Sequence, residues 1–162
     1  MAWEKLSTTV LTGTADEIDS GTIDARINLF ATLFIKDSGT ANLKLQFNDV
    51  TTTTYATRYN ENNSSDTTQD TQASIRLYQT GSGTNIERYV TMFISNIGSK
   101  EKLVTAQVNE MTATGAGTAP LSVSVSGKWE SGTNSITSIQ AINDAAGSFA
   151  ADSALVVYGS VE

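Results

Sequence analysis

The segment Asn42-Leu43-Lys44-Leu45-Gln46-Phe47-Asn48 alternates apolar and polar side chains along its whole length. Because successive side chains of a β-strand point to opposite faces, this alternation places Leu43, Leu45 and Phe47 on one face. The pattern is typical of a strand that buries one face and exposes the other. The segment Leu121–Trp129 repeats it, with small apolar residues opposed by serines. These two segments favour a β-protein.

A second kind of strand is more continuously apolar. In the segment Ile27–Lys36, one face is aliphatic and the other carries Phe30 and Phe34. Apolar residues on both faces predict a strand inside a sheet that is covered on both sides. Gly127 interrupts the alternation of the later strand, and a glycine there predicts a β-bulge.

Short runs of these two kinds recur along the chain. Further strands are predicted over Glu4–Leu11, Ile18–Ile23, Tyr55–Tyr59, Ser74–Gln79, Glu87–Ser95, Lys102–Met111, Ser135–Ile142 and Ala154–Gly159. Connections rich in turn-forming residues are Asp37–Thr40, Thr80–Asn85, Ile97–Lys100 and Ser131–Asn134. About ten short strands without an amphipathic helix indicate a sandwich or barrel. The length of 162 residues fits one domain, spanning residues 1–162.

The strand period also predicts the core. We expect two antiparallel sheets to enclose Leu29, Leu33, Leu43, Leu45, Phe47, Ile75, Leu77, Val90, Phe93, Val104, Val123 and Val125. The segment Asn60–Gln72 is strongly polar and is predicted to be a long loop. Loops of this length are uncommon unless they are functional or mobile.

The composition argues against several classes of function. The chain contains no cysteine and no histidine, which removes thiolate chemistry and the commonest general base and metal ligand. We therefore expect no enzyme, no catalytic residues and no cofactor. A net charge of −7 disfavours nucleic acid as a partner. The sequence shows neither a secretory signal nor a membrane span, so we expect synthesis in the cytoplasm.

Two acidic groups could in principle supply oxygen ligands to calcium. They are Asp16, Glu17 and Asp19, and Glu61, Asp66 and Asp70. Neither group has the spacing of a calcium-binding loop, and acidic residues equally suit solvated turns. Exposed loops are the favoured interpretation, so no metal site is expected. We also expect folding to need no divalent metal.

Six aromatic residues could form a stacking platform for a sugar or could pack in the core and at interfaces. They are Trp3, Tyr55, Tyr59, Tyr78, Tyr89 and Trp129. Packing is the favoured interpretation because five of them lie inside predicted strands. Arg58 and Arg76 lie in neighbouring predicted strands and are expected to form structural ion pairs with acidic residues.

Four stretches of the sequence resemble a group of small proteins encoded by tailed bacteriophages of aquatic bacteria. The stretches are Met1-Ala2-Trp3-Glu4-Lys5-Leu6, Leu43-Lys44-Leu45-Gln46-Phe47-Asn48, Thr57-Arg58-Tyr59-Asn60 and Gln72-Ala73-Ser74-Ile75-Arg76-Leu77. The resemblance covers roughly the first two-thirds of the chain. It implies a jelly-roll-like antiparallel β-sandwich of about eight to ten strands, on a capsid or tail surface and often trimeric. It implies no catalytic residue.

Three functions follow as hypotheses. The first is a virion structural protein, a capsid decoration or cement protein that contacts the major capsid protein or other virion subunits. The second is a tail-fibre or surface module that binds a glycan or receptor. The third is a fragment of a calcium-dependent adhesin, which the missing signal peptide disfavours. We expect a homo-oligomer, a trimer first, with contacts through Trp3 and the strand Leu155–Tyr158.

Overall fold

The computed structural model describes residues 2–79, 86–111 and 113–161, and within them the strands are antiparallel and form two sheets. The twelve strands are β1 (Ala2–Val10), β2 (Glu17–Asp19), β3 (Asn28–Lys36), β4 (Asn42–Phe47), β5 (Tyr55–Glu61), β6 (Thr67–Gln72), β7 (Ile75–Gln79), β8 (Glu87–Ser95), β9 (Lys102–Met111), β10 (Leu121–Trp129), β11 (Ile139–Ile142) and β12 (Ala154–Val161). The predicted all-β sandwich is confirmed, with more strands than expected. The described part of the chain contains no helix that could cross a membrane.

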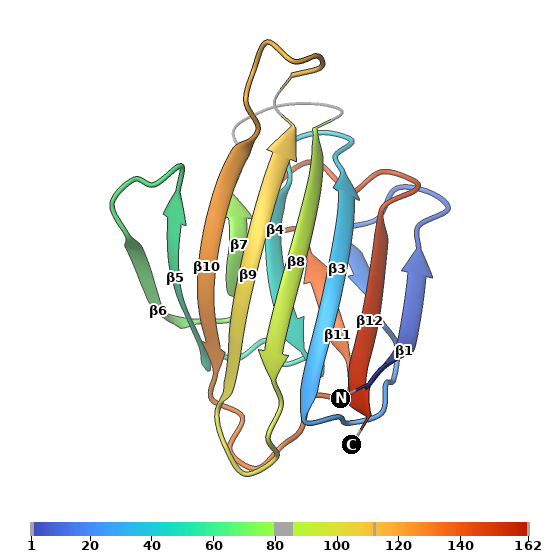
Figure 1. The fold of residues 1–162 in the computed structure, drawn as a ribbon, viewed down its shortest axis with the longest axis vertical. Coiled ribbons are helices and arrows are strands. Elements are labelled where there is room, and N and C mark those ends of the chain that lie inside the picture. Colours follow the sequence, from blue (N-terminus) through green and yellow to red (C-terminus); the bar gives the residue numbers. More distant parts are fainter. Residues whose placement is uncertain (1, 80–85, 112, 162) are drawn as a thin grey trace.

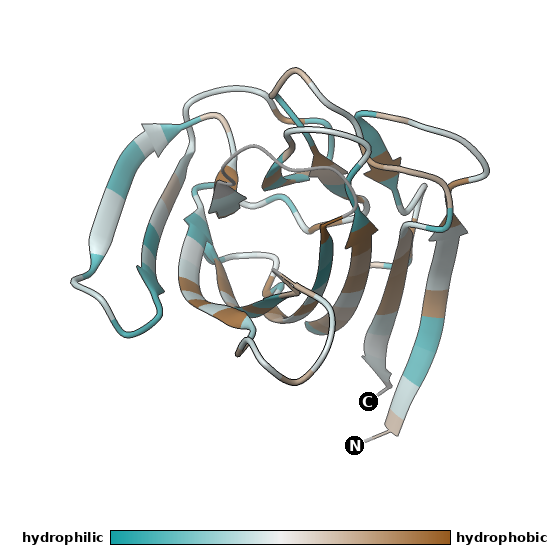
Figure 2. Cartoon of the chain, turned by 90° about the horizontal axis from the view of Figure 1, so that it is seen from above, coloured by the Kyte–Doolittle hydropathy of each residue, from teal (hydrophilic) through white to brown (hydrophobic). Residues whose placement is uncertain are grey.

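The two sheets differ in size. The larger has the order β1-β12-β3-β8-β9-β10-β5-β6, and the smaller has the order β2-β11-β4-β7. Figure 1 shows the larger sheet in front, with β1 at one edge and the β5–β6 hairpin at the other. Seen from above in Figure 2, this hairpin projects sideways and is mostly hydrophilic, while the hydrophobic segments gather between the sheets.

The strand order contains a jelly roll. When β5, β6, β9 and β10 are set aside, the other eight strands can be numbered one to eight along the chain. The larger sheet then has the order 1-8-3-6 and the smaller sheet 2-7-4-5. This is the order of a jelly roll, in which two Greek keys interlock. The jelly-roll-like fold expected from the resemblance is therefore present in the topology.

Two hairpins extend the larger sheet beyond the jelly roll. One is β9–β10, inserted between β8 and β11, and the other is β5–β6, inserted between β4 and β7. They pair with each other, because β10 lies antiparallel to β5. The extension therefore joins two insertions that are distant in the sequence, and the candidate site described below lies on it.

The core lies between the sheets and matches the predicted set with one exception. Eleven of the twelve predicted core residues are at most 2% exposed, but Phe93 is 59% exposed. The prediction of Phe93 was wrong because Val90, three residues earlier, faces the core, and side chains three apart in a strand point to opposite faces. Trp129 adds a buried aromatic centre, with its ring 5.6 Å from Phe47 and 6.0 Å from Tyr55.

The polar segment Asn60–Gln72 is not a long loop. β5 runs on to Glu61, and residues from Thr67 form β6, which pairs with β5. Polar residues can form this hairpin because β6 is an edge strand whose side chains are mostly exposed. Sequence alternation misses such a strand, since neither face is apolar.

Two further expectations about individual strands were wrong. β10 pairs with β9 and β5 without a register shift, so Gly127 makes no bulge. β3 does lie inside the larger sheet, but its second face is not covered, since Phe34 is 36% exposed. In a sandwich of two layers, the outer face of each sheet meets solvent.

Some element bounds differ from the sequence prediction. β11 begins at Ile139 and not at Ser135, and β2 covers only Glu17–Asp19. The backbone N–H groups of Thr137 and Ser138 donate hydrogen bonds to Asn48 Oδ1, and these bonds hold the first part of the predicted strand as a loop. The predicted connection Thr80–Asn85 lies outside the described residues.

Candidate functional site

The outer face of the larger sheet carries cross-strand rows of side chains. One row runs through Arg58, Ser126, Thr105, Phe93, Phe30 and Tyr158, each directly opposite the next on a neighbouring strand. The adjacent row runs through Asn60, Ser124, Gln107 and Thr91. Both rows are polar over β5, β9 and β10, and the first becomes aromatic over β8, β3 and β12.

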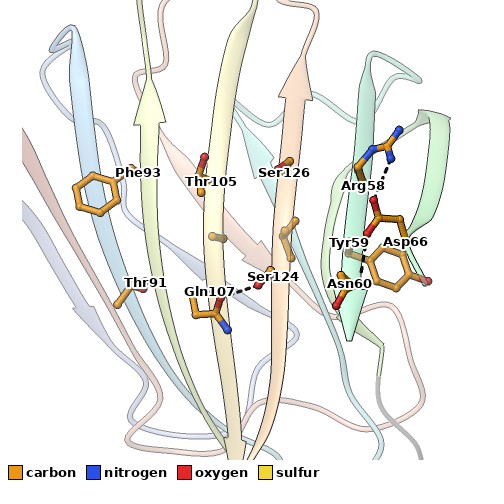
Figure 3. A pocket seen from close by; sticks show the side chains of 12 residues that line it. Arg58, Tyr59, Asn60, Asp66, Thr91, Phe93, Thr105, Gln107, Ser124 and Ser126 are labelled. Atoms are coloured by element: carbon orange, nitrogen blue, oxygen red, sulfur yellow. Dashed lines mark hydrogen bonds and ion pairs between the residues drawn. The ribbon is translucent and has the colours of Figure 1, made fainter. Parts of the chain in front are cut away.

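A groove lies over the polar part of these rows. Its volume is about 470 Å³, within the usual range for ligand sites. The floor consists of short side chains on β9 and β10, among them Thr105, Ser124 and Ser126. Phe93 borders the groove at β8, with its ring inclined over β3, and the β5–β6 hairpin forms the wall on the other side, as Figure 3 shows. The groove exists because small residues on two strands lie between larger ones.

Hydrogen bonds fix the amide of Gln107 in the floor. Its Nε2 donates to the Ser122 hydroxyl at 2.6 Å, and its Oε1 accepts from the Ser124 hydroxyl at 2.9 Å. A side chain held in one orientation offers its polar atoms to a ligand without a further loss of rotamer freedom. The floor is therefore preorganised as well as uncharged.

The hairpin wall contains a charged pair. The Arg58 Nη1 donates to Asp66 Oδ2 at 3.0 Å, and the Asn60 amide donates to Asp66 Oδ1 at 3.3 Å. These hydrogen bonds from Arg58 and Asn60 lower the pKa of the Asp66 carboxyl. The carboxylate thus stays ionised and keeps acceptor capacity beside a guanidinium donor. Asp66 and Arg58 are both exposed to solvent.

Beyond Phe93, aromatic side chains continue toward the β1 edge, where Trp3 is exposed and Phe30 and Tyr158 are half-buried. We call Trp3, Phe30, Phe93 and Tyr158 the aromatic cluster. The Phe30 and Phe93 ring centroids lie 4.8 Å apart, and Trp3 lies 6.2 Å from Phe30 and 6.5 Å from Phe93. Phe30 and Tyr158 are 6.1 Å apart. Trp3 is 43% exposed and Phe93 59%, so the cluster presents apolar surface to solvent.

The predicted acidic groups are arranged differently from what the sequence suggests. Glu17 and Asp19 lie together, and Asp49, which belongs to neither predicted group, completes a cluster whose carboxylate oxygens lie within 4.8 Å of one another. Burial, followed by repulsion from Asp19 and Asp49, raises the pKa of Glu17. Asp66 pairs with Arg58 instead of gathering with its predicted neighbours.

The aromatic residues named from the sequence divide between core and surface. Tyr55, Tyr78 and Trp129 are buried, which confirms packing for these three. Trp3 and Tyr89 are exposed on the larger sheet, so they do not pack in the core, and packing at an interface stays a prediction for them. Arg58 forms the expected ion pair, whereas the Arg76 guanidinium stacks 4.8 Å from the centre of the Tyr59 ring.

A buried charged cluster was not found by sequence reasoning. The Arg88 guanidinium on β8 lies 2.7 Å from Asp37 and 2.6 Å from Glu110 on β9. The Tyr78 hydroxyl of the smaller sheet donates to Glu110 at 3.3 Å. Burial raises the pKa of Asp37, with Arg88 opposing the effect, and burial raises that of Tyr78 to about 12. All four side chains are buried, so the cluster joins the two sheets and is not placed to meet a ligand.

Sequence reasoning also missed the groove residues Thr105, Gln107, Ser124 and Ser126. Their alternation with buried residues marks them as an exposed face, and that signal is shared by any solvated strand. A search for exposed and uncharged positions on adjacent strands would have reduced the number of candidate site residues. Their gathering into one groove depends on the pairing of β10 with both β9 and β5.

No family model, no curated protein and no solved structure matches the chain.

Proposed function

We propose that this chain is a structural protein of a bacteriophage particle, a capsid decoration or cement protein on the outer surface. Its partners are the major capsid protein or other virion subunits, together with further copies of itself in a trimer. The sequence resemblance to small phage proteins supports this proposal. The jelly-roll topology agrees with it, because this fold is common among viral capsid proteins.

The observation that carries the proposal is the aromatic cluster near the β1 edge. Exposed aromatic side chains in contact with one another mark surfaces that bind proteins. Trp3 lies on β1 and Tyr158 on β12, the two strands expected from the sequence to form subunit contacts. They are neighbours in the larger sheet. Leu155 and Val157 face the core, whereas Val156 and Tyr158 are half-buried and face outward from β12.

Light scattering on the purified protein tests self-association. We expect a mass of three chains, and we expect the double substitution Trp3→Ala with Tyr158→Ala to reduce it to one chain of 17.2 kDa. The matched control is Phe34→Ala, an exposed aromatic residue of the same sheet outside the cluster. A single-chain mass for the unaltered protein at micromolar concentration would contradict the trimer.

Labelling of phage particles tests the location. We expect an antibody against this chain to decorate the head of intact particles, and quantitative mass spectrometry to find a copy number comparable to that of the capsid subunit. A low copy number with label on the tail would instead support the second candidate. Absence from purified particles would contradict both virion assignments.

The second candidate is a tail-fibre or surface module that binds a glycan or receptor. It is favoured by the groove between Phe93 and the β5–β6 hairpin, which is about 470 Å³ in volume and lined by fixed polar groups. Fluorescently labelled protein should then bind to the surface of host cells. Failure of the labelled protein to bind host cells would contradict this candidate.

A further inference from the structure

The charges of the residues that line the groove restrict the kind of ligand that it can bind. Among its lining residues, the charged side chains are Arg58 and Asp66, which lie 3.0 Å apart and neutralise each other. The chain as a whole carries a net charge of −7. An anionic ligand would therefore meet a repelling protein and a groove without free positive charge. A cationic ligand would find no unpaired carboxylate in the lining.

The polar groups of the groove suit a ligand with several hydroxyl groups. Gln107 offers an oriented amide, and Thr105 and Ser126 offer hydroxyls from the adjacent row. The Arg58 and Asp66 pair places a donor and an acceptor side by side on the opposite wall. Adjacent hydroxyls of a sugar ring can donate to one such group and accept from the other.

The groove also has an apolar side, formed by an exposed aromatic ring on β8. Phe93 is 59% exposed, and Phe30 supports it with a ring centroid 4.8 Å away. The C–H groups on one face of a pyranose ring are apolar and carry a slight positive charge, and they pack on the negative face of an aromatic ring. The groove thus combines an exposed aromatic ring at one side with hydroxyl, amide and paired charged groups, and a neutral oligosaccharide laid across the strands uses all of them.

We propose that the groove formed by β8, β9, β10 and the β5–β6 hairpin binds a neutral saccharide, with one pyranose ring packed on Phe93. Phe93 and Arg58 lie three strand spacings apart, about 14 Å, so other rings of the same saccharide contact Gln107 in the floor and the Arg58 and Asp66 pair on the hairpin. This inference rests on the second candidate function and names its ligand and its site. In the strand order, Phe93 is the member of the aromatic cluster farthest from β1, so Trp3 and Tyr158 remain available for subunit contacts.

Affinity electrophoresis in native gels tests the proposal. The gels contain a neutral polysaccharide, in separate runs a glucan, a galactomannan or a xylan, or the acidic polymer polygalacturonate. We expect retardation by at least one neutral polymer and none by polygalacturonate. The substitutions Phe93→Ala and Gln107→Ala should each weaken the association by roughly tenfold or more.

The matched control is Phe34→Ala, which removes another exposed aromatic side chain from the same face, outside the groove. It should leave retardation unchanged. The proposal is overturned if no neutral polymer retards the protein, if polygalacturonate retards it more strongly, or if Phe34→Ala weakens retardation as much as Phe93→Ala.

A parallel assay separates failure of this site from failure of the broader function. Labelled protein is bound to host cells, with and without the soluble neutral polymers and with the Phe93→Ala variant. If the polymers do not compete and Phe93→Ala binds host cells as well as the unaltered protein, the saccharide site is overturned. Receptor binding by another surface would then remain supported. Dissociation of the oligomer by Phe93→Ala, without any retardation of the unaltered protein, would assign the groove to a contact between copies and would also overturn the proposal.

Discussion

The backbone of Gly127 in β10 lies directly against the side chain of Ile75 in β7. A Cβ atom at Gly127 would be 2.8 Å from both Cδ1 and Cγ2 of Ile75. This contact lets the inserted β9–β10 hairpin pack closely on the smaller sheet, since Ile75 is fully buried. Glycine is required here by packing and not by a turn.

We therefore expect Gly127→Ala to destabilise the fold, by about 1–3 kcal/mol, because a methyl group would overlap a stiff β-branched side chain. Chemical denaturation measures the change. Ser126→Ala, on the exposed face of the same strand, is the control and should change stability by less than about 0.5 kcal/mol. In an Ile75→Ala background the Gly127→Ala change should cost little, and an equal cost in both backgrounds would place the strain elsewhere.

Phe47 provides a test of the aromatic core. Its side chain is fully buried between Tyr55, at 6.2 Å, and Trp129, at 5.6 Å. We expect Phe47→Ala to lower the free energy of unfolding by about 3–5 kcal/mol through lost burial and a cavity. Thermal denaturation checks this. An unchanged melting temperature would show that the side chain is not in the core.

The buried Asp37 should give a characteristic pH dependence. Because burial raises its pKa in the folded protein, the folded state binds the proton more tightly than the unfolded state. Its stabilising contribution is full below the unfolded pKa and is lost as the pH rises through the folded pKa. The stability of the unaltered protein relative to Asp37→Asn should thus be greatest at low pH and should decline as the pH rises above 3.8, the ordinary pKa of an aspartate.

Asp66 supplies the opposite control for that measurement. Its pKa is lowered, so its contribution is present above the unfolded pKa and is lost as the pH falls through the folded pKa. The stability of the unaltered protein relative to Asp66→Asn should therefore increase as the pH rises. If the stability of the unaltered protein relative to Asp37→Asn also increased with pH, the attraction of Arg88 would affect the Asp37 pKa more than burial does.

The acidic group of Glu17, Asp19 and Asp49 leads to a prediction about metals. We expect folding to need no divalent metal, so a chelator should leave the melting temperature unchanged. The variant Glu17→Gln with Asp49→Asn serves as the control. A sharp drop on chelation, absent from this variant, would show that the group holds a structural cation.

The sequence by itself determined most strands and the inward face of each. The alternation in Asn42–Asn48 and Leu121–Trp129 states which side chains are apolar, and burial of those side chains drives the pairing of the sheets. The period of two also holds at β8, where it separates Val90 from the exposed Phe93. It fails at β6, where no face is apolar.

Only the tertiary structure decided which outward-facing side chains become neighbours across the strands of the larger sheet. Arg58, Phe93 and Ser126 come from segments far apart in the chain, and the register of β5, β10, β9 and β8 brings them to one row. The buried contact of Arg88 with Asp37 likewise depends on how strands are ordered. Alternation within one strand fixes a face but says nothing of the neighbouring strand, because register is set by packing over the whole sheet.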